Sequence, residues 1–215
     1  ESIFLDMFGD PVSNPMRWPE TETLGEISAI TSGITKGRRL TGQATRSVPY
    51  LAVANVQDRS LRLDVLKQIE ATPDEIERFR LQPGDLLLTE GGDPDKLGRG
   101  TVWGSEIAEC IHQNHIFRVR LIGEAWEPSF VSWLLSSERG KRFFLRRAKQ
   151  TTGIASINKT QLSEFPLLGP PVDLQNEFRS CTESIALERG RVVQAGAQLD
   201  ALFASLQQRA FRGEL

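Results

Sequence analysis

The sequence contains few of the residues on which secreted folds, metal sites and membrane spans depend. Its 215 residues include two cysteines and two histidines. Two cysteines cannot form a disulfide framework, which favours a reducing compartment. No apolar run approaches the roughly 20 residues of a membrane-spanning helix, and no signal-peptide pattern opens the chain. We therefore expect a cytoplasmic globular protein without a membrane partner.

Motifs of catalysis are also missing. The sequence has no P-loop, no glycine-rich loop for S-adenosylmethionine and no Asn/Asp-Pro-Pro-aromatic motif of amino-methyl transfer. No acidic residue is followed two positions later by lysine, as in metal-dependent nucleases. Cys110, His112 and His115 resemble a ligand set, but on a strand the third points away from the first two. We expect no catalytic residue, metal or cofactor in this chain.

Charge is unevenly distributed along the sequence. The net charge is −2, which by itself argues against a nucleic-acid partner. Residues 33–47 hold four basic and no acidic residues, and residues 138–160 hold seven basic residues and one acidic. These 38 residues therefore carry +10 and the rest of the chain −12. Together with nearby Gln, Asn, Ser and Thr, such clusters suit duplex DNA, although solvated surfaces with no ligand remain the alternative.

The pattern of secondary structure predicts an α+β fold. Short strands between turns are expected at 48–56, 82–89, 101–103 and 116–122, and a capped helix at 72–79. A helix is expected over 128–148 with its weak point at Gly140, followed by a strand or extended segment over 161–168. A mostly β domain therefore precedes a long helix of coiled-coil type.

The last forty residues favour one long helix. No proline occurs after Pro171, and apolar residues recur every seven positions from 178 to 206. Over 173–210 this gives a rod of about 57 Å. The residues expected to face a partner helix are Phe178, Ile185, Val192, Leu199, Leu202 and Leu206. A long helix lying on its own domain is the alternative.

Several segments resemble one family, the specificity subunit of type I restriction-modification systems. They are LGEISAITSGIT (24–35), VPYLAVANV (48–56), LQPGDLLLTEGG (81–92), NHIFRVR (114–120) and KQTTGIASINKTQLSEFPLLGPP (149–171). FLDMFGDP near the start and LQQRAFRGEL at the end are similar to that family's helix ends. The match is specific in the 149–175 block.

The resemblance implies a non-catalytic, sequence-specific reader of double-stranded DNA. In that family two target-recognition domains, each followed by a long helix, read the halves of a bipartite target. The subunit docks modification subunits, which bind S-adenosylmethionine and methylate adenine, and a restriction subunit joins them. This chain has one such domain and one such helix, so the resemblance implies a half-subunit or an excised half. A second half-subunit would pair through the long helix.

The implied organisation is the end of a spacer-type helix at 1–10, a recognition domain at 11–171 and a dimerisation or spacer helix at 172–215. We expect phosphate and base contacts from loops 34–47, 89–100 and 149–160. The candidates are Lys36, Arg38, Arg39, Arg46, Lys96, Arg99, Arg146, Arg147, Lys149, Thr151, Thr152, Asn158 and Lys159. Two alternatives are a protein-interaction module without DNA readout and a fragment of a fused methyltransferase-nuclease, which the missing motifs disfavour.

Overall fold

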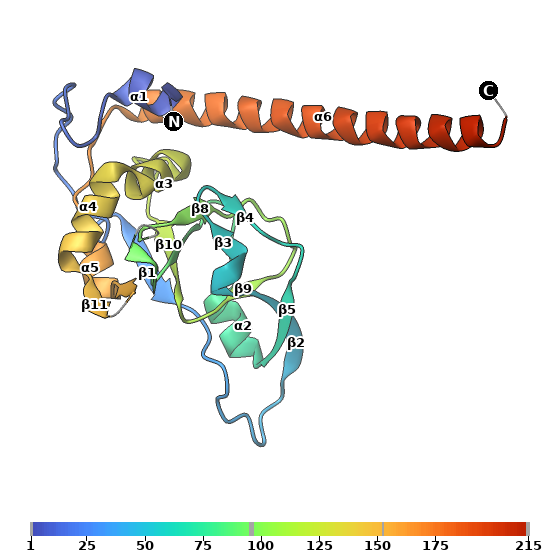
Figure 1. The fold of residues 1–215 in the computed structure, drawn as a ribbon. Coiled ribbons are helices and arrows are strands. Elements are labelled where there is room, and N and C mark those ends of the chain that lie inside the picture. Colours follow the sequence, from blue (N-terminus) through green and yellow to red (C-terminus); the bar gives the residue numbers. More distant parts are fainter. Residues whose placement is uncertain (1, 95–96, 152, 214–215) are drawn as a thin grey trace.

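A computed structural model describes residues 2–94, 97–151 and 153–213. A mixed α+β domain carries one long helix that projects from one side of it (Figure 1), which confirms the expected fold class. In the described part of the chain no helix is both long and apolar enough to cross a membrane.

The main sheet has four antiparallel strands in the order β1-β10-β6-β8. Its central strand β6 is apolar along most of its length, and all four residues of Leu86–Thr89 are buried. The strands are β1 (Ser28–Ser32), β6 (Leu86–Thr89), β8 (Gly100–Val102) and β10 (Ile116–Leu121). The largest core cluster lies between this sheet and the helices that follow it.

A second sheet, β5-β2-β9, carries the helix α2 (Pro73–Phe79). Thr72 caps this helix, since its hydroxyl accepts a hydrogen bond from the amide of Glu75 at 3.2 Å and Glu75 bonds back to the Thr72 amide at 2.9 Å. The capped helix expected at 72–79 is therefore confirmed. The strands are β2 (Arg46–Leu51), β5 (Lys67–Ala71) and β9 (Ile111–His112).

The remaining strands are short. β11 (Lys149–Thr151), β12 (Ile154–Ser156) and β7 (Gly91–Gly92) form a third sheet. β3 (Val56–Gln57) and β4 (Ser60–Leu61) form a hairpin after the short 3-10 helix η1 (Val53–Asn55). The strand expected at 48–56 thus ends at Leu51, where η1 follows.

Two predictions between residues 128 and 168 need correction. The expected helix is divided into α3 (Pro128–Ser136) and α4 (Glu138–Arg147), and the break is at Ser137 and not at Gly140. Gly140 allows the break, because a Cβ there would lie 1.9 Å from the carbonyl oxygen of Leu135. Residues 161–163 belong to helix α5 (Lys159–Ser163) and not to a strand, since Asn158 and Gln161 form a capping box. Only the segment after α5 is extended.

The long helix α6 (Val172–Phe211) confirms the helix expected at 173–210. Its first turns pack on α3 and on the short helix α1 (Ser2–Phe8), and the rest extends beyond the domain (Figure 1). Phe178, predicted to begin the partner-facing row, is fully buried against its own domain. Its ring centroid lies 5.5 Å from those of Phe4 and Phe8 and 5.6 Å from that of Trp133. Phe178 therefore fixes the helix to the domain.

Candidate nucleic-acid interface

Two of the three predicted loops are joined by backbone hydrogen bonds. β7 of the 89–100 loop pairs with β12 of the 149–160 loop, with Gly92 opposite Ala155 and Gly91 opposite Ser156. A Cβ at position 91 would lie 2.7 Å from the Ala155 carbonyl oxygen, so this close pairing requires glycine. The Ile157 amide also donates to the Glu90 carbonyl at 2.9 Å. Loops 60 residues apart in sequence thus form one surface.

The third loop is joined to the other two through the turn between β9 and β10. The Ile34 amide donates to the His112 carbonyl at 2.8 Å, and the Asn114 amide donates to the Ile34 carbonyl at 3.0 Å. On its other side the turn meets Glu90, whose amide donates to the His115 carbonyl at 2.9 Å. The 33–47 loop then extends from the side of the domain that faces away from α6 (Figure 1).

Arg38 is held inside this loop by acidic and backbone acceptors. Its Nε lies 2.5 Å from Glu75 Oε1 and its Nη2 2.7 Å from Glu75 Oε2. The same guanidinium donates to the carbonyls of Thr35 and Glu70. The hydrogen bonds from Arg38 hold the pKa of Glu75 below its usual value despite partial burial. Arg38 therefore anchors the loop to α2.

Arg46 is held in a similar way at the other stem of the loop. Its guanidinium bonds both carboxylate oxygens of Glu109, at 2.5 and 2.8 Å. Hydrogen bonding from Arg46 lowers the pKa of Glu109, with a further contribution from the nearby charge of Arg80. Because about half of its side chain remains exposed, Arg46 can still approach an anion.

Other predicted cations lie exposed on the same loops. Within the described ranges, the side chains of Arg39, of Lys149 and of Arg146 at the end of α4 form no hydrogen bond or ion pair. The ammonium of exposed Lys36 lies 5.4 Å from the ring centroid of Tyr50. Since these groups keep their charge without an acidic partner, they are the residues of this surface best suited to bind phosphates.

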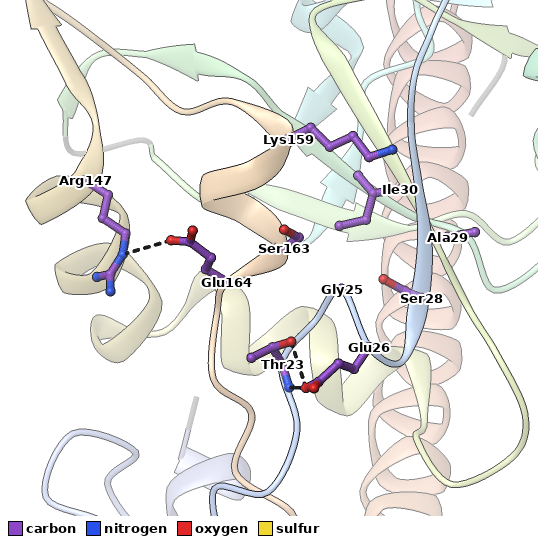
Figure 2. A pocket seen from close by; sticks show the side chains of 10 residues that line it. All are labelled: Thr23, Gly25, Glu26, Ser28, Ala29, Ile30, Arg147, Lys159, Ser163 and Glu164. Atoms are coloured by element: carbon purple, nitrogen blue, oxygen red, sulfur yellow. Dashed lines mark hydrogen bonds and ion pairs between the residues drawn. The ribbon is translucent and has the colours of Figure 1, made fainter.

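Arg147 and Lys159 lie beside a groove of about 760 Å³ between β1 and α5. Figure 2 shows the Lys159 side chain extending from α5 towards Ile30 of β1, while Arg147 is turned to Glu164. The Arg147 guanidinium lies 3.7 Å from Glu164 and 3.8 Å from the Phe143 ring centroid. Lys159 thus projects freely and Arg147 is partly neutralised.

The remaining candidates have local structural roles or are not described. Arg99 is half-buried and donates to Gln57 at 3.4 Å. The side chain of Asn158 accepts from the Gln161 amide at 2.8 Å and so caps α5. Lys96 and Thr152 lie outside the described residues, and of Thr151 the structure describes only its place in β11.

The structure separates the three residues considered as metal ligands. Cys110 is buried, and burial raises the pKa of its thiol to about 12. His112 is fully buried, its Nδ1 lies 3.0 Å from the Ile116 carbonyl oxygen, and burial lowers its pKa to about 4. His115 is exposed instead, with its Nδ1 2.6 Å from Glu90 Oε2.

Glu90 was not among the residues selected from the sequence, although it lies at the centre of this surface. It is 25 positions from His115 along the chain. The pattern of apolar residues predicts that Glu90 and His115 lie near the ends of strands. It does not predict that these two strands, β6 and β10, are neighbours in the sheet. Only the register of the sheet, with Thr89 opposite Ile116, brings them together.

The projecting part of α6 carries an exposed apolar row. The exposed fractions of Ile185, Val192, Leu199, Leu202 and Leu206 are 37%, 70%, 66%, 56% and 39%. A row of this length on a monomer is typical of a helix that packs against another helix. It begins one heptad later than predicted, because Phe178 is used by the domain.

Comparisons with known proteins agree with the sequence resemblance. No protein-family model matches the chain. The putative type I restriction enzyme MjaX specificity subunit of Methanocaldococcus jannaschii is 23% identical over 165 residues, which are 76% of this chain and 38% of that protein. The type I restriction enzyme EcoKI specificity subunit of Escherichia coli K12 is 26% identical over 174 residues, 78% of this chain and 37% of that protein.

A solved structure shows the same fold. The HsdS subunit from Thermoanaerobacter tengcongensis superposes with a TM-score of 0.53 at 19% identity, over all of this chain and 50% of that one. The chain is thus similar to specificity subunits of type I restriction enzymes, which confirms the resemblance seen in its sequence. It spans less than half the length of the two curated relatives.

Proposed function

We propose that this chain is a sequence-specific reader of double-stranded DNA, acting as one recognition unit of a type I specificity subunit. The observation that carries the proposal is the meeting of the two basic segments with loop 89–100, all distant in sequence, around the β9–β10 turn. Phosphate contacts from exposed Lys and Arg position a protein on the duplex, and polar side chains between them read base edges.

In this proposal the chain itself catalyses nothing. Its role is to deliver the modification subunit, and with it the restriction subunit, to half of a bipartite target. S-adenosylmethionine then binds to the modification subunit and not to this chain. The relation to specificity subunits supports this division of labour.

The exposed row on α6 supports a helical partner. In the proposed assembly, Ile185, Val192 and Leu199 pack against a second long helix, supplied by another recognition unit or by a second copy of the chain. Burying about three large side chains against a partner contributes several kcal/mol, since each is now exposed to water. The rod then sets the distance between two DNA-reading surfaces.

Selection from a randomised duplex library tests the proposal, with and without the modification subunit. We expect enrichment of duplexes that share one short sequence. The paired substitution Arg39→Ala with Lys149→Ala should weaken binding to all duplexes by a similar factor. Arg189→Ala on α6 with Arg212→Ala at its C-cap is the matched control for charge. Absence of enrichment in both arms would leave a protein-interaction module as the function.

A further inference from the structure

We propose that Glu90 and His115 form a base-reading pair at the centre of the basic surface. In this pair Glu90 selects, on the strand that it faces, a base that carries an amino group in the major groove, which is cytosine or adenine. The inference rests on the proposed function, because it requires that the chain binds duplex DNA.

The two side chains face each other across the end of the main sheet. Thr89 of β6 is opposite Ile116 of β10, and Glu90 and His115 are the next pair beyond them. His115 Nδ1 lies 2.6 Å from Glu90 Oε2, and their side chains are 56% and 34% exposed. The pair is therefore open to a ligand. A side-chain hydrogen bond this exposed contributes little to stability, so the fold does not require the pair.

The backbone beneath the pair is held in place by hydrogen bonds on every side. The turn closes with a bond from the Ile116 amide to the Gln113 carbonyl at 2.9 Å. The Gln113 amide donates to the Leu51 carbonyl at 2.9 Å, which ties the turn to β2. Glu90 is fixed through its own amide and carbonyl, to His115 and Ile157. A rigid support of this kind is what precise base recognition needs.

The pair also lies between the cations best placed for phosphates. On one side, Asn114 is bonded to Ile34, two residues before Lys36. On the other side, Glu90 is bonded to Ile157, and β12 leads through its partner β11 to Lys149. A duplex held by phosphate contacts at both flanks presents the base edges of its groove to the residues between them.

The chemistry of the pair defines which bases it accepts. A carboxylate only accepts hydrogen bonds, so His115 donates from Nδ1 and keeps Nε2 for the ligand. Within the described residues Glu90 Oε1 has no hydrogen-bond donor. In the major groove, the amino groups of cytosine and adenine can donate to this oxygen, whereas the O6 and N7 of guanine and the O4 of thymine repel it.

Library selection with the full chain, comparing wild type with Glu90→Gln, tests the inference. Wild type should enrich duplexes with cytosine or adenine at one position of the recovered sequence. Glu90→Gln, whose amide also donates, should reduce that preference about 5- to 100-fold at this position alone. Glu124→Gln is the matched control, because Glu124 is an exposed acidic residue that lies beside α6. It should leave every preference unchanged.

The outcomes separate the two proposals. If wild type and Glu90→Gln enrich the same bases at every position, the base-reading pair is wrong and the proposed function stands. If wild type enriches no duplex, the proposed function itself fails, and the pair fails with it. If Glu90→Gln does not fold, His115→Gln provides a second test, because His115 faces Glu90 across the end of the main sheet. It should alter the preference at the same position or at its neighbour.

Discussion

Arg38 and Glu75 form a two-point ion pair that joins the 33–47 loop to the first turn of α2, with Nε–Oε1 and Nη2–Oε2 distances of 2.5 and 2.7 Å. Both side chains are mostly buried, with 19% and 24% of their surfaces exposed. Glu75 also completes the capping box of α2. One carboxylate thus stabilises a helix and positions the loop that carries Arg39. The neighbouring arginines 38 and 39 therefore have different roles, although the sequence presents them alike.

This difference predicts that alanine at position 38 lowers the stability of the fold, whereas alanine at position 39 lowers the affinity for DNA. Arg38→Ala removes hydrogen bonds from a largely buried carboxylate and should lower the free energy of unfolding by about 1–3 kcal/mol. Arg39→Ala should leave stability unchanged within about 0.5 kcal/mol and weaken binding to all duplexes. Urea unfolding and duplex titration of both variants measure the two effects. Equal losses of stability would contradict the assignment.

Alanine substitutions at two helical glycines, Gly140 and Gly190, should have opposite effects on stability. Alanine at position 140 places a Cβ 1.9 Å from the Leu135 carbonyl oxygen, so α3 and α4 must separate. We expect a loss of at least about 2 kcal/mol from this overpacking. At exposed position 190 of α6 nothing lies within 4 Å of an added Cβ, and alanine should favour the helix by up to about 1 kcal/mol. Thermal unfolding of the two variants should shift in opposite directions.

Substitutions at Phe178 and Leu199 distinguish the two roles of α6, which are packing on its own domain and association with a partner helix. Phe178→Ala opens a cavity among buried rings and should cost about 3–5 kcal/mol of stability. Leu199→Asp changes an exposed residue and should leave the domain's stability intact while it abolishes association through the helix. Analytical ultracentrifugation of wild type and Leu199→Asp, with and without the modification subunit, tests the second effect. Unchanged association would mean that the exposed row has no helical partner.

Buried His112 predicts a loss of stability in mild acid. Its pKa is lowered from 6.5 to about 4, chiefly by burial, so the unfolded chain binds a proton more tightly than the folded chain does. This contribution is intact above pH 6.5 and is lost as the pH falls towards 4, to a total of about 3 kcal/mol. His112→Asn keeps a donor near the Ile116 carbonyl and should flatten this part of the profile. Urea unfolding between pH 7 and pH 4 measures the difference; parallel profiles would contradict it.

Elements that depend on residues close together in the sequence were predicted from the sequence alone. The Thr72–Glu75 capping box and the seven-residue repeat of α6 are read from neighbouring residues, and both appear as expected. A feature that depends on a distant contact was missed. The burial of Phe178 follows from its packing against α1, at the other end of the chain.

The candidate surface shows the same limit. Segregation of charge located the basic segments in the sequence, because charge is a property of sequence. It did not distinguish Arg38 and Arg46, which have acidic partners 37 and 63 positions away, from Arg39, which has none in the described chain. Pairing across such distances is set by the tertiary fold, and only the folded structure supplies it.

The most direct test of the central claim is the affinity of the chain for duplex DNA measured over a salt series. Five exposed cations lie on the surface: Lys36, Arg39, Arg146, Lys149 and Lys159. If each releases one counterion, the slope of log K against log salt should be about −4.5. Wild type should give this slope, and Arg39→Ala a slope shallower by about 1. A flat line, or no binding at low salt, would contradict the account.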